Sequence, residues 1–150
     1  MLYLAADHRG FELKEKIKAH LTEKGVDFED CGAKSYDKDD DYPDFAYEAA
    51  KKVAEDPQQN RAILLCGSGV GVQVAANKVK GVYCAQVLNK EFAKGVSEHD
   101  NTNAIAFGAD YIEEEEMMKA IDMFLETPGA VEERHVRRFK KIQEIESNSC

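Results

Sequence analysis

Short apolar runs along the chain alternate with longer stretches in which apolar residues recur every three or four positions. The runs predict buried strands, and the recurring positions predict amphipathic helices. Strands are expected at residues 1–6, 26–30, 61–65, 82–87 and 103–107, and helices at residues 11–24, 43–55, 90–99, 113–125 and 131–146, with one more after Gly71. Strands that alternate with helices predict an α/β sandwich with a parallel sheet and right-handed crossovers.

The length and net charge of the chain limit its possible domain organisation and partners. The 150 residues show no internal repeat and no long linker, so a single domain over residues 1–150 is expected. A formal net charge of −9 argues against a nucleic-acid partner. No apolar stretch approaches the ~20 residues of a membrane helix, and the first residues lack the pattern of a signal peptide. We therefore expect a cytoplasmic protein with no membrane partner.

The four cysteines have neither metal nor disulfide spacing. Cys31, Cys66, Cys84 and Cys150 form no CxxC pair, which predicts neither a zinc site nor a disulfide framework. No other residues have the spacing of metal ligands, so no metal is expected. Cys31, Cys84 and Cys150 are expected to be structural or incidental.

Residues 61–78 carry the strongest chemical signal. Cys66 ends an apolar run and is followed by Gly67-Ser68-Gly69-Val70-Gly71 and a stretch that can form a helix. Three glycines let the backbone turn tightly and point its N–H groups at one spot beside a helix N-terminus, which favours an anion there and a thiolate at Cys66. The alternative is a loop that only lets strand and helix pack closely, with Cys66 as a small buried apolar residue.

Polar residues are expected to meet at one edge of the sheet. In parallel sheets, ligands bind beyond the carboxyl ends of the strands, where the strand order reverses. Asp7 and His8 follow the first strand, Cys66 to Gly71 follow the third, and residues 99–103 lead into the fifth. We expect these three groups to converge on one site.

At this point the chain resembles the ribose-5-phosphate isomerase B family, which includes galactose-6-phosphate isomerase subunits and an allose-6-phosphate isomerase. The resemblance covers residues 1 to about 146. It rests on DHRGFELK (7–14), DYP (41–43), LLCGSGVG (64–71), AANK (75–78), HDNTNAIAFG (99–108) and RHVRR (134–138). It implies a Rossmann-like three-layer fold with a five-stranded parallel sheet, and a homodimer or tetramer with shared active sites. The implied reaction interconverts an aldose phosphate and a ketose phosphate without metal or cofactor.

The resemblance also implies roles for individual residues. Cys66 matches the base that moves a proton between C2 and C1, and Val72 stands where other members have a glutamate, so the chain is similar to the cysteine type. His99 matches the residue that opens the sugar ring, with Asp7 close by; capping of a helix or turn is the alternative for both. Ser68 and the loop amides match the hole for the enediolate anion. Substrate binding is implied for the loop residues Gly67, Gly69, Val70 and Gly71, for Asp100 and Asn101, and for the phosphate-binding set His8, Arg134, His135 and Arg138.

The terminal helix is expected to act on a neighbouring subunit. Arg134 and Arg138 are four residues apart, so they share a helix face and can grip one phosphate together. The resemblance implies that this helix reaches the other subunit, whose His8 completes the phosphate site. A solvated basic helix end is the alternative.

Two positions depart from the pattern of the family. Asp100 stands where asparagine is common, and Asp110 stands where an arginine is thought to help bind substrate. An anion in place of a cation changes the local field. Sugar choice or affinity is expected to differ from that of a typical member unless Asp110 points away.

Three functions remain open at this point. The first is interconversion of D-ribose 5-phosphate and D-ribulose 5-phosphate, and the second is isomerisation of a hexose 6-phosphate of the allose or galactose type. The third is a non-catalytic sugar-phosphate- or nucleotide-binding module, although the loop lacks both the P-loop ending and the GxGxxG spacing. A thiol redox protein or a cysteine phosphatase would need CxxC or CxxxxxR, which are absent. One chain with Cys66, His99, Arg134 and Arg138 indicates a self-sufficient homo-oligomer.

Overall fold

The computed structural model describes residues 1–148, and Cys150 lies outside them. Five parallel strands form one sheet in the order β2-β1-β3-β5-β4, which confirms the predicted α/β class. The strands are β1 (Leu2–Ala6), β2 (Phe28–Asp30), β3 (Arg61–Cys66), β4 (Cys84–Gln86) and β5 (Ala104–Gly108). The helices are α1 (Phe11–Glu23), α2 (Tyr42–Glu55), α3 (Val70–Ala76), α4 (Lys90–Asp100), α5 (Glu114–Glu126) and α6 (Glu133–Asn148).

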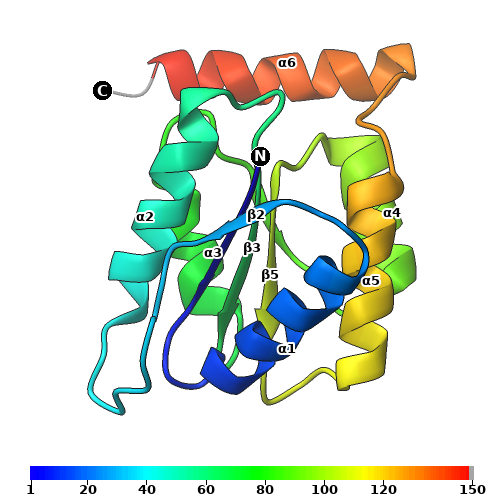
Figure 1. The fold of residues 1–150 in the computed structure, drawn as a ribbon. Helices are drawn as coiled ribbons and strands as arrows, with labels where there is room; N and C mark the ends of the chain where they lie inside the picture. Colours follow the sequence, from blue (N-terminus) through cyan, green and yellow to red (C-terminus); the bar gives the residue numbers. More distant parts are fainter. Residues whose placement is uncertain (149–150) are drawn as a thin grey trace.

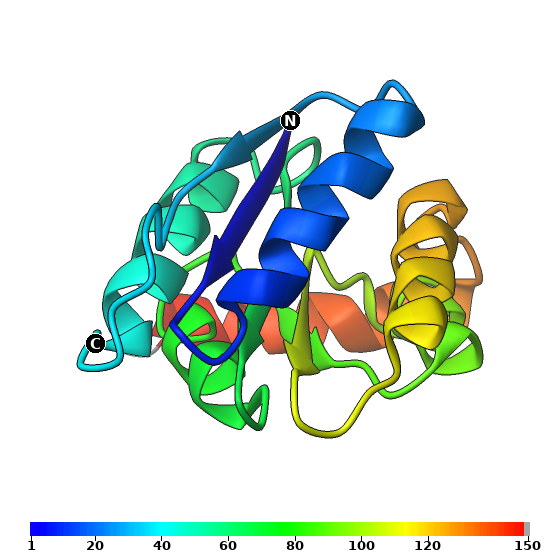
Figure 2. The ribbon, with the colours of Figure 1, turned by 60° about the horizontal axis from the view of Figure 1, so that its bottom comes forward.

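Helices cover both faces of the sheet, as Figures 1 and 2 show. Successive residues of a strand point to opposite faces, so β1 contributes Leu2, Leu4 and Ala6 to one core and Tyr3 and Ala5 to the other. The first core packs against α1, α4 and α5, and the second packs against α2 and α3. Because both faces are covered, β1, β3 and β5 read as nearly continuous apolar runs.

Helix α6 lies across the amino-terminal side of the sheet (Figure 1). Glu146 accepts hydrogen bonds from the N–H of Gly81 and from the hydroxyl of Tyr83, each at 2.9 Å. The ring of Phe139 packs edge to face on that of Tyr83, with 4.7 Å between centroids. These contacts hold α6 beside the segment that enters β4. Within residues 1–148, no helix is both long and apolar enough to cross a membrane.

The short strand β2 is held at its end by charged groups. Asp30 accepts hydrogen bonds from Nζ of Lys14 at 2.6 Å and of Lys18 at 3.0 Å, and the side chain of Lys14 is fully buried. Beyond β2 the chain stays beside β1, because the N–H of Cys31 donates to Leu4 O and that of Ala33 to Ala6 O. This pairing brings loop 31–41 to the carboxyl end of β1.

Candidate active site

Cys66 lies at the carboxyl end of β3, next to the point where the strand order reverses between β1 and β3. Its side chain is nearly buried, and the N–H of Gly69 donates to Sγ at 3.1 Å. Gly69 has φ +80°, and a Cβ there would come within 2.7 Å of the backbone nitrogen of Gly108. Only glycine fits this turn, which aims its amide N–H at the sulfur.

Ser68 and the other loop residues surround the sulfur. Ser68 is exposed; its Oγ accepts from the N–H of Val70 at 3.3 Å, and its carbonyl oxygen accepts from Nε2 of Gln86. Two of the amides expected to bind an anion therefore donate here to Cys66 and Ser68. Anion binding by the residues Gly67 to Gly71 stays a prediction. Gln86, on β4, was not predicted from the sequence, where an isolated glutamine gives no signal.

Asp7 is brought beside this loop by strand register. Ala6 pairs with Leu65, so the residue after β1 lies next to the end of β3. Asp7 is buried, and its Oδ1 accepts from the N–H groups of Arg9 at 2.9 Å and Gly10 at 3.1 Å. Burial raises the pKa of the Asp7 carboxyl, against the opposing effect of the Gly10 N–H. The turn-holding role considered for Asp7 is therefore present, and it leaves Oδ2 for another task.

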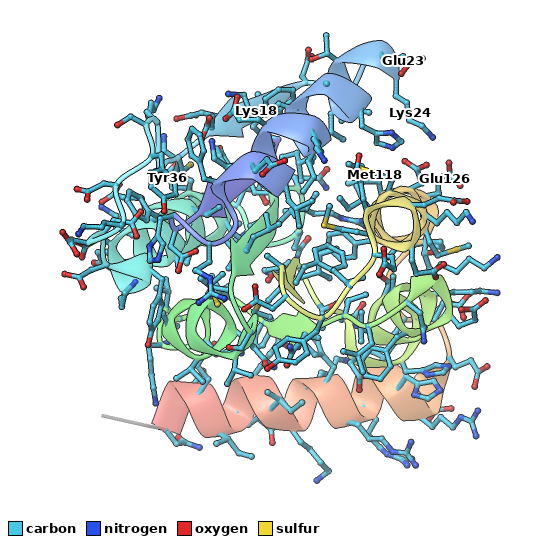
Figure 3. All side chains as sticks on the ribbon, turned by 90° about the horizontal axis from the view of Figure 1, so that it is seen from below. Lys18, Glu23, Lys24, Tyr36, Met118 and Glu126 are labelled. Carbon is cyan, nitrogen blue, oxygen red and sulfur yellow. The ribbon has the colours of Figure 1, made fainter. Side chains whose placement is uncertain are left out.

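His8 lies in the turn after β1, beside loop 31–41. Its Nδ1 is 2.6 Å from Oδ1 of Asp40, and its ring meets the edge of Tyr36, labelled in Figure 3, at 6.2 Å between centroids. Asp7, His8 and Asp40 offer ligand atoms within 4.8 Å of one another, a group that could hold a metal ion. Sequence spacing does not reveal this group because 32 residues separate His8 from Asp40. The absence of a bound metal stays a prediction.

The carboxylate of Asp110 has a positively charged partner. It pairs with the guanidinium of Arg9 at the mouth of the loop. A Cβ at Gly67 would lie 3.2 Å from Oδ2 of Asp110 and 3.4 Å from Cζ of Arg9, so the pair lies directly over Gly67. Arg9 therefore offsets the negative charge at position 110, and the expected change in local field is smaller than the sequence indicates.

The predicted convergence of His99 with Cys66 is wrong within one chain. Ala104, the first residue of β5, pairs with Ala62 near the start of β3, whereas Cys66 pairs with Gly108. Residues 99–103 lead into a parallel strand, so they lie at its amino end, opposite Cys66 and Asp7. The error was to treat a segment that enters a strand like one that leaves it.

The amino end of the sheet carries its own cluster of predicted site residues. His99, at the end of α4, stacks on His135 of α6 with 4.7 Å between ring centroids and 22° between planes. The two rings border a cavity of about 290 Å³ whose other lining residues are Asp100, Arg138, Phe139 and Ile142. Arg134 is exposed and donates from Nε to Glu132 at 2.9 Å. The predicted site residues of one chain thus form two separate groups at opposite ends of the sheet, called here the carboxyl-end and amino-end half-sites.

Asn101 has a structural task at this end. It terminates α4 in the left-handed conformation, with φ 53°, and its Oδ1 accepts from the N–H of Ala130 at 2.7 Å. Its side chain therefore joins α4 to the loop before α6. Substrate binding by Asn101 and by Asp100 stays a prediction.

The thiols of this chain are expected to differ in reactivity. Burial raises the pKa of Cys84 to about 12 and that of Cys31 to about 11, so at pH 8 only about 10⁻³ of Cys31 is thiolate. In a Cys150→Ser background, we expect iodoacetamide to modify Cys66 at least 10-fold faster than Cys31 or Cys84. Peptide mapping over time measures this. Modification of Cys31 at the rate of Cys66 would contradict it, and Cys66→Ala is the control.

Together, the parallel sheet and the helices on both of its faces define a Rossmann-like α/β fold, with Cys66 at its switch point. The sequence model of one family, Ribose/Galactose Isomerase, matches residues 2–142. The chain belongs to this family.

Individual relatives agree with this assignment over nearly the full length. Ribose-5-phosphate isomerase B of Mycolicibacterium paratuberculosis is 44% identical over 145 residues, covering 97% of this chain and 91% of the relative. The crystal structure of ribose-5-phosphate isomerase B from Mycoplasma genitalium with bound ribulose-5-phosphate superposes with a TM-score of 0.95 at 39% identity, covering 99% and 97% of the two chains. The type B enzyme of Trypanosoma cruzi gives 0.92 at 35% identity, covering 99% of both. These structures confirm the predicted Rossmann-like fold.

Proposed function

We propose that this chain is an aldose–ketose isomerase that interconverts D-ribose 5-phosphate and D-ribulose 5-phosphate through an enediolate. The observation that carries the proposal is the Gly69 amide aimed at the sulfur of Cys66, at the switch point of the sheet. The names of the relatives support ribose 5-phosphate as the substrate. A non-catalytic binding module has no need of a thiol so placed.

Cys66 serves as the base in this mechanism. Its thiolate removes the proton from C2 of the open-chain aldose, which gives the enediolate. A proton then passes from the oxygen on C2 to the oxygen on C1, and the Cys66 thiol returns its proton to C1, which leaves the ketose. The negative charge moves from sulfur to the enediolate oxygen during the first transfer. The loop amides and Ser68 stabilise that oxygen, and fixed donors of this kind supply a few kcal/mol each. No step in this sequence requires a metal or a cofactor.

A second copy of the chain completes each site. His99, which opens the sugar ring, and the arginines 134 and 138, which bind the phosphate, lie at the opposite end of the sheet from Cys66. A two-fold axis sets the amino end of each sheet against the carboxyl end of the other. The dimer then has two complete sites, and each consists of one half-site from either chain. Asp7 and His8 of one chain then face His99 and His135 of the other.

The surface around β4 supports this arrangement. β4 is an edge strand of three residues, and exposed apolar side chains flank it on α3, on α4 and in the segment between β4 and α4. These are Val70 (48% exposed), Val74 (53%), Leu88 (58%) and Phe92 (47%). An unpaired edge bordered by apolar groups is typical of a protein–protein contact. A homodimer covers this surface, and paired dimers give the tetramer.

A substrate panel tests the proposed reaction. After exhaustive chelation, we expect turnover of D-ribose 5-phosphate with kcat/KM about 10-fold or more above that of allose 6-phosphate and galactose 6-phosphate, because the longer sugar must fit the same site. Coupled assays and proton exchange from C2 measure the rates, with Cys66→Ala as the control. A higher kcat/KM for a hexose phosphate would select the second function. Binding without turnover would select the binding module, and activity restored only by a divalent ion would contradict the metal-free mechanism.

A further inference from the structure

His8 has an acidic partner that its position in the sequence does not reveal. Asp40 Oδ1 lies 2.6 Å from Nδ1 of His8 and also accepts the backbone N–H of His8 at 3.2 Å. One carboxylate oxygen thus contacts both the ring and the backbone of the same residue. These contacts fix the imidazole relative to the end of β1.

The buried position of the Asp40 carboxylate is energetically unfavourable. Its side chain is only 7% exposed, and its Oδ2 is buried with no hydrogen-bond partner among residues 1–148. The buried carboxyl of Asp7 is close by, which adds repulsion. A buried carboxylate with an unmet oxygen destabilises the fold. Holding loop 31–41 in place does not account for this choice of residue, because a neutral acceptor would serve as well.

We infer that Asp40 is a positioning residue that holds the ring of His8 with Nδ1 on the carboxylate and Nε2 free to face a phosphate. An ionised carboxylate only accepts hydrogen bonds, so the proton of the neutral ring must be on Nδ1. Nε2 is then the nitrogen left for a ligand, and its N–H donates to phosphate oxygen when the ring is protonated. Carboxylates orient metal-bound and catalytic histidines in the same way. The inference rests on the proposed function, which assigns His8 to the phosphate.

The tautomer of His8 can be read directly by NMR. In histidine ¹⁵N-labelled protein, with His8 assigned by His8→Gln, we expect the neutral ring to carry its proton on Nδ1. Asp40→Asn should keep this tautomer, because an amide oxygen still accepts. Asp40→Ala should lose it. Asp39→Asn is the matched control, because it removes a charge from the neighbouring exposed residue of the same loop.

Kinetics and phosphate binding separate positioning from a purely structural role. We expect Asp40→Ala to raise the KM for D-ribose 5-phosphate about 10-fold and to change kcat far less, since phosphate is bound in the ground and transition states alike. Inorganic phosphate should shift the His8 resonances in the unaltered protein and in Asp39→Asn at concentrations that leave Asp40→Ala unchanged. Asp40→Ser, too short to reach Nδ1, gives the same readouts if the alanine variant does not fold.

Two results would overturn the inference. One is a proton on Nε2 of neutral His8 in the unaltered protein. The other is a folded Asp40→Ala variant with unchanged tautomer and KM. If the unaltered protein does not turn over D-ribose 5-phosphate, the proposed function fails, while the tautomer and the inorganic phosphate titration still decide the role of Asp40.

Discussion

Replacing Cys66 by alanine is expected to lower kcat for D-ribose 5-phosphate by at least about 10²- to 10⁴-fold, the usual contribution of a positioned base. Substrate binding should change far less, because the substitution removes the contact between Sγ and the Gly69 N–H but keeps the glycine that permits the left-handed turn. Steady-state kinetics and calorimetric titration of ribulose 5-phosphate measure the two quantities.

A serine variant sharpens this test. Cys66→Ser keeps a hydrogen-bonding group of similar shape but replaces the thiol by a hydroxyl, which is a far weaker acid. It should be nearly as inactive as the alanine variant and should bind substrate normally. Near-normal turnover in either variant would remove Cys66 from the role of base. A loss of both binding and folding would instead identify Cys66 as a core residue.

Mixing two inactive variants is expected to restore activity. Cys66→Ala damages the carboxyl-end half-site and Arg138→Ala damages the amino-end half-site. Random re-pairing makes half of the dimers mixed, and each of these has one intact site and one doubly damaged site. An equal mixture should therefore regain about a quarter of the normal activity when assayed below KM.

The controls for this experiment come from the same helix and from mass measurement. Arg137→Ala removes a charge next to Arg138 and should retain activity, because residue 137 lies on another face of α6. Native mass spectrometry of differently tagged chains shows whether mixed dimers form. Mixed dimers without recovered activity would disprove the shared site.

Much of the fold follows from local patterns. The apolar runs at residues 1–6, 61–65 and 103–107 match β1, β3 and β5, because central strands of a parallel sheet are buried on both faces. The edge strand β4 is shorter than predicted, Cys84–Gln86 against residues 82–87, because an edge strand pairs on one side only. Helix α6 begins and ends two residues later than predicted, at Glu133 and Asn148.

Less of the candidate site could be predicted from local sequence patterns. Cys66, Gly69 and Asp7 lie together as expected, since strand ends and glycines are local signals. His99 does not join them, because the direction of each strand decides which end a flanking loop meets. Asp40 and Gln86 were missed because their partners, His8 and Ser68, are brought to them only by tertiary structure.

The charged cluster at the end of β2 links acid stability to the site. Burial alone would raise the pKa of Asp30, but hydrogen bonds from Lys14, the N–H of Gly32 and Lys18 hold it below its ordinary value. A carboxyl whose pKa is lowered by folding stabilises the protein above its unfolded pKa and loses that contribution as the pH falls through its folded pKa. Acid therefore weakens the support of β2 only below the ordinary carboxyl pKa of about 4. The loop that follows β2 carries Asp40, so acid in that range is expected to loosen the loop that holds His8 while the central strands stay folded.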